Sequence, residues 1–312
     1  PIPTPIATQI SKIDGMMQVY VPAGSFIMGL DSGSSDEKPA HAVTLDAFWI
    51  DKFEVSNAMY ALCVKAGKCP QPSSVKSYKR DSYYGNSQFD NYPVIYVSWE
   101  NANAYCKWAG RRLPSEAEWE KAARGTDGRM YPWGNVAPDQ NKLNYNNNVG
   151  DTTEVGKYPD GKSFYGALDM AGNVWEWVND WYDETYYSKS LSQNPTGPIS
   201  GQSRVLRGGA WDYDDLFARA SFRYWFDPSF IFNFIGFNKV ITEFGFDGGR
   251  RFSRPHGKSD RIKLRHHLTS VERVFASFVF GTRIVREFLR QGGEAFTLPG
   301  AFAEFLGKGQ LL

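Results

Sequence analysis

Alternation of apolar and polar residues predicts short β-strands in the first half of the chain. Residues 16–28 and 42–55 place β-branched and aromatic residues at every second position, as in a strand with one buried face. A proline and glycine turn at 22–24 interrupts the first segment, which therefore predicts two strands. Two further apolar runs, at 93–97 and 204–207, have the length and composition of strands.

Serine caps mark the expected helices. Ser56, Ser98 and Ser115 each stand directly before a helix-forming segment, where a serine hydroxyl can accept a hydrogen bond from a free N–H group of the first turn. The expected helices cover residues 57–65, 99–108 and 116–123. Between 125 and 201 turn-forming residues dominate, with tryptophans as scattered anchors, so no regular element is expected there.

The two ends of the chain differ from its middle. Residues 1–15 open with prolines at every second position, which favour extended structure, and they predict a linker. Residues 238–312 contain no Trp or Tyr and carry 13 Lys+Arg against 7 Asp+Glu, and helical spacing recurs at 270–290. We expect a basic, partly helical extension over 241–312. A structural role is favoured there over a nucleic-acid-binding or partner-binding one.

Composition limits the classes of function. The net charge of the 312 residues is +1, so nucleic acid is not an expected partner except through the basic tail. Aromatic residues make up 16% of the chain, with 30 Gly and 17 Pro, which is typical of a loop-rich globular fold. No apolar run is long enough to span a membrane. We expect a soluble domain, which could be displayed on a surface as part of a longer chain. Its compartment cannot be inferred.

The cysteines do not predict metal chemistry. Cys63 and Cys69 are close enough in sequence for a local disulfide in an oxidising compartment, and Cys106 lies in an apolar stretch typical of a buried thiol. No CxxC pair is present, so a zinc site is not expected.

Six ordered motifs carry a resemblance to a known family. They are VPAGSFIMG at 21–29, RLPSEAEWEKAAR at 112–124, YPWGN at 131–135, DMAGNVWEW at 169–177, RVLRGGAW at 204–211 and IGF at 235–237. In these segments the chain resembles the formylglycine-generating enzyme (sulfatase-modifying factor) family. The resemblance implies an α+β, C-type-lectin-like fold over residues 16–240, with short helices, small twisted antiparallel sheets and long loops.

The founding chemistry of that family is not expected in this chain. The family's enzymes oxidise a sulfatase cysteine with copper held by two cysteines between the last two motifs. Residues 212–234 contain no cysteine, and no other side chain there can replace a thiolate as copper ligand and nucleophile. Ergothioneine-type iron oxidases of the same family need a His-rich partner domain that this chain lacks. We therefore expect a noncatalytic protein without copper.

The resemblance also implies structural calcium sites, since Ca²⁺ takes carboxylate, amide and backbone oxygens. One site matches Asp169, Gly172, Val174 and Glu176. The other matches Asn144, Tyr145, Asn147 and Val149, with an amide at Asn147 where a carboxylate is more usual. A simple polar turn at 144–148 is the alternative interpretation of this second set.

The stretch 212–237 has the composition of a binding surface, because ten of its 26 residues are aromatic. We expect it to bind a protein or another macromolecular ligand. The candidate contact residues are Asp212, Tyr213, Asp214, Asp215, Leu216, Phe217, Phe222, Tyr224, Trp225, Phe226, Asp227, Ser229, Phe230, Ile231, Phe232, Asn233 and Phe234.

The same stretch lacks Lys, Glu, Gln and Met, four residue types that number 46 in the whole chain. Mutation of only the adenines in Asn codons gives Phe, Tyr, Ser, Leu, Ile, Asp and Asn, but none of those four. In this respect the stretch is similar to the variable proteins of diversity-generating retroelements, which diversify a lectin-like fold by adenine mutagenesis. Trp225 is not an Asn-codon product, and Asn238 stands where the family has Arg. An ordinary noncatalytic sensor or binding domain is the alternative, and an oxidase comes last.

Overall fold

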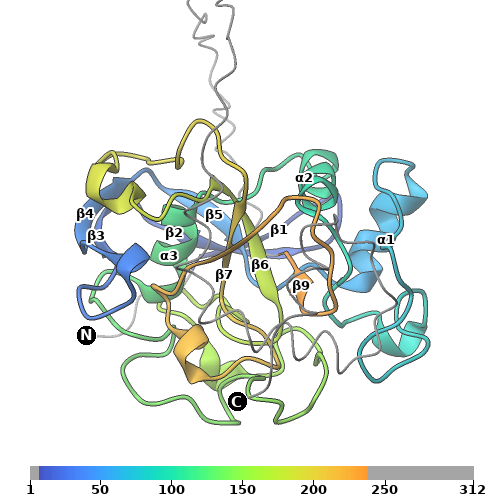
Figure 1. Ribbon diagram of the computed structural model, residues 1–312. Helices are drawn as coiled ribbons and strands as arrows, with labels where there is room; N and C mark the ends of the chain where they lie inside the picture. Colours follow the sequence, from blue (N-terminus) through green and yellow to red (C-terminus); the bar gives the residue numbers. More distant parts are fainter. Residues whose placement is uncertain (1–6, 238–312) are drawn as a thin grey trace, which may run out of the picture. The chain divides into compact units, whose positions relative to one another are not determined.

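The computed structural model describes residues 7–237, which form small sheets and short helices joined by long loops (Figure 1). The strands are β1 (Thr8–Ile10), β2 (Met17–Val21), β3 (Gly24–Met28), β4 (His41–Leu45), β5 (Phe48–Asp51), β6 (Trp175–Trp181), β7 (Arg204–Arg207), β8 (Tyr224–Phe226) and β9 (Ile235–Gly236). The α-helices are α1 (Asn57–Lys65), α2 (Trp99–Trp108) and α3 (Glu116–Arg124). The 3-10 helices are η1 (Ser35–Glu37), η2 (Ser87–Phe89), η3 (Pro159–Gly161), η4 (Tyr186–Lys189) and η5 (Asp215–Ala218). The predicted extension over 241–312 lies outside the described residues.

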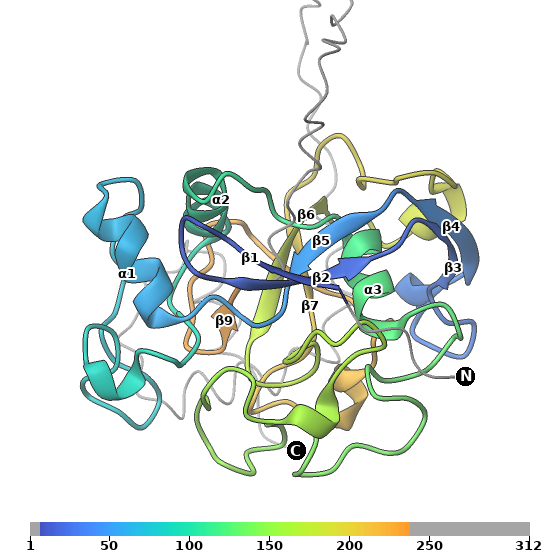
Figure 2. The same ribbon diagram turned by 180° about the vertical axis from the view of Figure 1, so that it is seen from behind.

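The strands form three sheets within the described residues. One has the order β1-β2-β5, a second pairs β3 with β4, and the third has the order β8-β7-β6-β9. All pairings are antiparallel except that of β6 with β9. The two views in Figures 1 and 2 show the β1-β2-β5 sheet crossing one side of β6 and β7. This mixture of short helices and small sheets confirms the predicted α+β fold.

Two clusters of buried residues lie on opposite faces of β6. Trp175 and Trp177 point into the cluster that α1 and α2 cover, together with Leu206 of β7. Val178, one position on, packs into the cluster formed with α3 and strands β2 to β5. Because side chains alternate across a strand, one seven-residue strand can serve both clusters. The sheet that carries the C-terminal stretch is therefore supported from both sides.

The serine caps form as predicted. Ser56, Ser98 and Ser115 each accept a hydrogen bond from the backbone N–H three residues on, at 3.2–3.3 Å. The Glu118 carboxylate also accepts from the Ser115 N–H at 2.7 Å, which completes a capping box. Cys63 and Cys69 form a disulfide, which the sequence left open, and the predicted buried thiol of Cys106 is confirmed. None of the helices within residues 7–237 has the length and apolarity for a membrane span.

Three expectations about elements were wrong. Thr8–Ile10 is not linker but pairs with β2, because the proline spacing ends at Pro5 and leaves a segment that can join a sheet. Residues 93–97 do not form a strand, since Tyr96 adopts a left-handed backbone with φ of 58°. The loop expected over 125–201 contains the central strand β6, whose Trp175 and Trp177 are core residues.

Candidate ligand-binding surface

Buried charges anchor the predicted binding stretch from behind. Glu37 of η1 is fully buried, and its oxygens accept hydrogen bonds from Arg219 Nη2 at 2.6 Å and Ser221 Oγ at 2.7 Å. Arg223 makes a two-point contact with Glu116 of α3, from Nε to Oε1 at 2.7 Å and from Nη2 to Oε2 at 2.9 Å. Each contact joins the stretch to an element distant in sequence, so the backbone path of the stretch is fixed at several points.

Two buried groups of this frame, Arg223 and Glu120, have pKa values shifted in favour of their charged forms. Burial opposes the positive charge of Arg223, but Glu116 outweighs it and holds the pKa of Arg223 above its ordinary value. Burial likewise works to raise the pKa of Glu120 in α3, yet Arg207 and Arg124 hold it below the usual range. The frame behind the stretch is therefore a network of compensated charges.

In front of this frame, six aromatic side chains form a closed circuit of ring contacts. In order around it they are Tyr213, Tyr224, Phe226, Phe230, Phe232 and Phe234. Successive ring centroids are between 4.1 and 6.3 Å apart. Trp175 of β6 lies beneath the circuit, edge-on to Tyr213 at 5.3 Å and stacked on Tyr224 at 5.1 Å. Sequence reasoning placed Trp175 in the core but did not connect it with the site.

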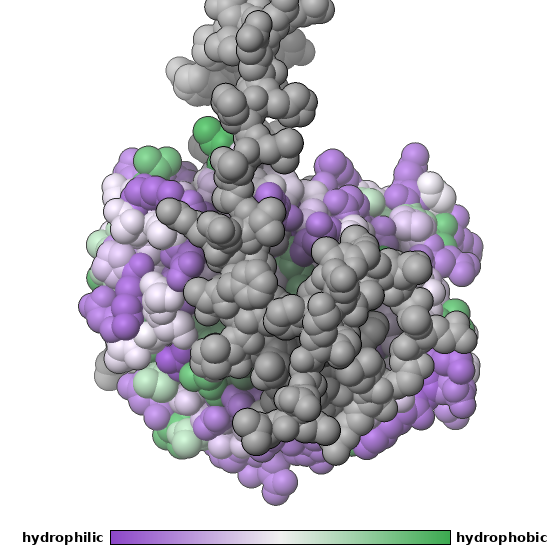
Figure 3. All heavy atoms as spheres, in the orientation of Figure 1, coloured by the Kyte–Doolittle hydropathy of each residue, from purple (hydrophilic) through white to green (hydrophobic). Residues whose placement is uncertain are grey.

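Most of the predicted contact residues are accessible. Within 212–232 the accessible ones, which we call the 212–232 surface, are Asp212, Tyr213, Asp214, Asp215, Leu216, Phe217, Tyr224, Trp225, Phe226, Asp227, Ser229, Phe230, Ile231 and Phe232. Trp225 points away from the circuit, because it alternates with its neighbours along β8, and it stacks on Tyr182 at 4.0 Å. Outside the grey residues, the face drawn in Figure 3 is mostly hydrophilic, with small, separate hydrophobic spots.

Three predicted contact residues are buried and belong to the frame. Phe222 is 9% exposed, Phe234 is 6% exposed and Asn233 is 3% exposed. Phe222 packs against Trp175, and Phe234 is the inner member of the aromatic circuit. The burial of these three side chains argues against their contact with a ligand on the 212–232 surface.

The charges that remain accessible on this surface are negative. Asp214 caps η5 by accepting from the Leu216 N–H at 3.1 Å, and Asp215 follows it in an exposed position. Asp227 accepts from the Ser229 hydroxyl at 2.6 Å and from its N–H at 2.8 Å, and these two bonds hold the pKa of Asp227 below its ordinary value. Arg219 and Arg223, the two arginines of the stretch, turn inward to Glu37 and Glu116.

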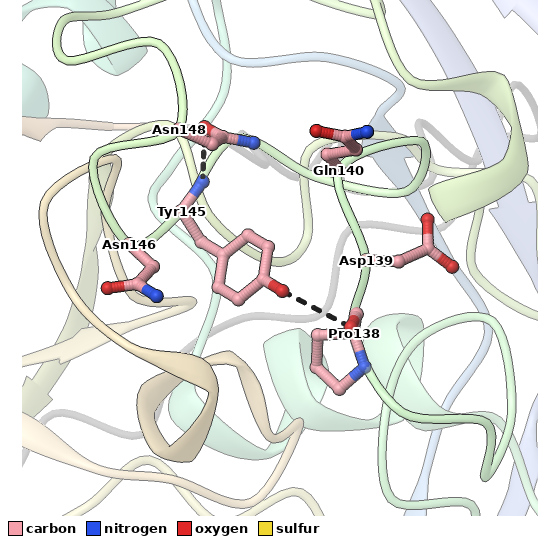
Figure 4. Close-up of a pocket in the computed structure, with 6 residues that line it drawn as sticks. All are labelled: Pro138, Asp139, Gln140, Tyr145, Asn146 and Asn148. Carbon is pink, nitrogen blue, oxygen red and sulfur yellow. Dashed lines mark hydrogen bonds between the residues drawn. The ribbon is translucent and has the colours of Figure 1, made fainter.

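A polar hollow of about 350 Å³ adjoins the surface (Figure 4). It is lined by Pro138, Asp139, Gln140, Tyr145, Asn146 and Asn148. The Tyr145 hydroxyl donates to the Pro138 carbonyl at 3.2 Å, as the dashed line in Figure 4 marks. The Asn146 N–H donates to the Tyr213 carbonyl at 2.7 Å, so the hollow and the aromatic circuit share a backbone contact.

Comparison with known proteins decides the family. The model of the sulfatase-modifying factor enzyme 1-like domain matches residues 6–243. The chain belongs to this family. It is 36% identical over 245 residues to the formylglycine-generating enzyme of Streptomyces coelicolor, covering 62% of this chain and 78% of the relative. It is also 36% identical over 250 residues to the serine/threonine-protein kinase Pkn1 of Chlamydia trachomatis, covering 75% of this chain but only 38% of that kinase. Enzymes are therefore among its relatives.

Solved structures agree with the sulfatase-modifying factor fold. PvdO from Pseudomonas aeruginosa superposes with a TM-score of 0.65 at 27% identity, over 76% of this chain and 98% of that one. Treponema denticola variable protein 1 superposes with a TM-score of 0.62 at 24% identity, over 76% of this chain and 99% of that one. The second likeness shows a common fold.

The three cysteines of this chain lie outside the 212–232 surface. Cys63 and Cys69 are joined in a disulfide that closes the loop after α1. Cys106 is fully buried in α2, and burial raises the pKa of its thiol well above the ordinary value. Residues 212–232 themselves include no cysteine.

The first set of predicted calcium ligands is partly engaged by protein donors. The Asp169 carboxylate accepts from the Gly156 N–H at 2.6 Å, and the Glu176 carboxylate accepts from the Trp119 indole N–H at 2.5 Å. Gly172, with φ of 75°, lies so close to the Asn144 carbonyl that a side chain there would collide with it. Among the described residues no group of three or more His, Cys, Asp or Glu could hold a metal. A calcium ion here would depend largely on amide and backbone oxygens.

The second set fits a cation less well. The Val149 carbonyl, an expected ligand, accepts a hydrogen bond from the Lys79 ammonium at 3.1 Å, which already brings a positive charge to this position. Asn144 Oδ1, by contrast, is a buried acceptor with no donor among the described residues. Tyr145 and Asn147 belong to the loop that borders the polar hollow. The Lys79 contact argues against calcium at this second site, and the first site stays a prediction.

Proposed function

We propose that this chain is a noncatalytic binding protein that recognises a protein or another macromolecule through the 212–232 surface. The observation that carries the proposal is the arrangement of the stretch in two layers. Buried arginines and carboxylates hold its backbone, while five of the six circuit rings pack against the core and stay partly exposed. Rigid aromatic side chains bury a large area at a small entropy cost, which suits them to recognition.

The position of the cysteines supports the noncatalytic part of the proposal. Oxidation of a sulfatase cysteine in the family's enzymes needs thiolates at this surface, and the cysteines of this chain lie elsewhere. Metal analysis of the purified chain and an assay with a sulfatase-derived peptide test this part. Stoichiometric copper together with formylglycine formation would overturn it.

The separation of the layers also supports diversification of the surface. Ala218 to Arg223 are buried and hold the frame, so the accessible positions on either side can change without altering it. Trp225, which an Asn codon cannot give, is an accessible position that stacks on Tyr182 and also contacts Tyr224, and it counts against diversification. The ordinary sensor domain remains the second candidate, because Asn238 departs from the family pattern.

Two experiments test the proposal. A genome search should find, beside a reverse transcriptase, a near-copy of this coding stretch with Asn codons at the accessible positions. Close relatives that all share residues 212–234 would instead support the sensor domain. For binding itself, peptides selected on the wild-type chain should lose roughly a hundredfold in affinity for the variant Y224A/F226A/F230A. The control variant L191A/I199A, altered at exposed hydrophobic residues outside the surface, should bind them unchanged.

A further inference from the structure

Among residues 7–237, the aromatic circuit has carboxylates near it but no Lys or Arg side chain over its rings. Within residues 7–237, every lysine or arginine found over a ring lies over an aromatic residue outside the circuit. Arg219 is the nearest in sequence, and it lies over the buried Phe222 while pairing with Glu37. The rings of the 212–232 surface therefore offer faces with a negative π cloud to an incoming group.

Elsewhere the same molecule places guanidinium groups on such faces. Arg204 lies between Trp99 and Trp181, with its guanidinium carbon 3.9 Å and 3.5 Å from the two ring centroids. Arg80 lies 4.9 Å from the ring centroids of both Phe89 and Tyr92. Half-buried aromatic rings in this fold thus form stable contacts with a planar cation where the chain supplies one.

Acidic side chains at the edges of the 212–232 surface also suit a positively charged ligand group. Asp212, Asp214 and Asp215 lie at the end of the stretch that borders η5, and Asp227 lies between the circuit members Phe226 and Phe230. The polar hollow next to Tyr213 adds the amide groups of Gln140, Asn146 and Asn148, whose oxygens can accept hydrogen bonds. Such a field attracts positive groups and repels phosphate, which disfavours nucleic acid and anionic lipid.

We propose that the ligand of the 212–232 surface presents a basic protein segment, with arginine or lysine side chains lying over the aromatic circuit and pairing with its flanking aspartates. This inference rests on the proposed binding function and adds the chemical class of the partner. Cation–π contacts and charge pairs at the rim would act together, because both favour the same positive group.

A random peptide display library is the probe that tests this. The library is selected on the wild-type chain, and the enriched peptides are then measured against three variants by fluorescence anisotropy. Y224A/F226A/F230A identifies the peptides that bind through the circuit. In that subset we expect enrichment in Arg and Lys, and about tenfold weaker binding to D214N/D215N/D227N at about 50 mM salt. The loss should shrink at about 1 M salt, where screening shortens the range of the charges.

The control D81N/E154Q/D160N removes the same number of charges from exposed acids outside the stretch. It should bind the selected peptides like wild type, which separates a local effect from net charge. Thermal melts of all variants check that they fold. Peptides that depend on the circuit but lack Arg and Lys, or that bind D214N/D215N/D227N unchanged, would overturn the basic partner and leave the binding function standing. If no enriched peptide depends on the circuit, the proposed function itself fails.

Discussion

Arg223 connects the binding stretch with two distant parts of the chain. Its guanidinium contacts the Glu116 carboxylate at two points and donates to the Asp36 carbonyl at 2.9 Å. With 1% of its surface exposed, it is among the most deeply buried charges of the molecule. A residue in this position holds the frame without contributing to the accessible surface, so its loss should affect folding before binding.

We expect R223A to lower the free energy of unfolding by about 3–5 kcal/mol, because Glu116 would be left as a buried charge without its main partner. Urea denaturation followed by circular dichroism measures this. K76A is the matched control, since Lys76 and Asp81 form an exposed pair with side chains 60% and 95% accessible, and it should cost less than about 1 kcal/mol. A cost for R223A as small as that of K76A would contradict the role of the anchor.

We expect Asp180 of β6 to make the free energy of unfolding depend on pH. Burial raises the pKa of its carboxyl well above the ordinary value, and the nearby Glu116 charge adds to the effect. Above the ordinary pKa of 3.8, the Asp180 carboxyl of the unfolded chain has lost its proton, whereas that of the folded chain still holds it. The free energy of unfolding therefore falls as the pH rises from 3.8 toward the higher pKa of the folded chain.

D180N should remove that slope and make the chain more stable than wild type at pH 8. The asparagine amide oxygen can still accept from the Glu116 N–H, which now bonds to Asp180 at 2.9 Å. Thermal denaturation of both proteins at several pH values between about 4 and 8 gives the comparison. Parallel pH profiles for the two proteins would show that Asp180 does not titrate as described.

At the scale of elements, the helices were predictable because their signals are local. The serine caps located the starts of α1 and α3, both caps form in the structure, and the predicted ends of these helices are right to within a residue. The strand expected at 93–97 failed because a single residue, Tyr96, changes backbone region, which composition does not encode. β6 was missed because its residues face two different clusters, so no simple alternation of apolar and polar positions marks it.

The candidate site was predictable as a segment but not residue by residue. Aromatic content located the stretch, yet Phe222 and Phe230 look alike in sequence and differ in the structure, where the first is core and the second half exposed. Which ring turns inward depends on anchors such as Glu37, which lies far away in the chain. Such long-range contacts cannot be inferred from one sequence.

This difference between rings can be measured. We expect F222S to cost about 3–5 kcal/mol of unfolding free energy, because it removes a buried aromatic side chain and leaves a polar group in a cavity. F230S should cost only about 1–2 kcal/mol, since its ring is partly solvated in the native state. Denaturant titrations of both variants decide the matter. Equal costs would mean that the aromatic circuit is part of the core rather than a surface open to a ligand.

At the scale of the whole molecule, a structural calcium ion is a prediction that can be tested by its effect on stability. If the site of Asp169 and Glu176 binds Ca²⁺, the ion should stabilise the folded chain by about 2.7 kcal/mol at a hundredfold excess over its dissociation constant. Differential scanning calorimetry with Ca²⁺ and with EDTA measures this as a rise in Tm. D169N should lose the rise, whereas N147A, at the less suitable second site, should keep it. An identical Tm with and without Ca²⁺ would exclude a structural ion.

The closed aromatic circuit has a consequence for how such a surface can vary over generations. Each ring of the circuit contacts two others, so a change at one position alters the room left for its neighbours. Sister sequences should therefore show paired changes at 213 with 224 and at 226 with 230. The number of different surfaces that can form would then depend on which pairs of rings fit together, and not on each position independently.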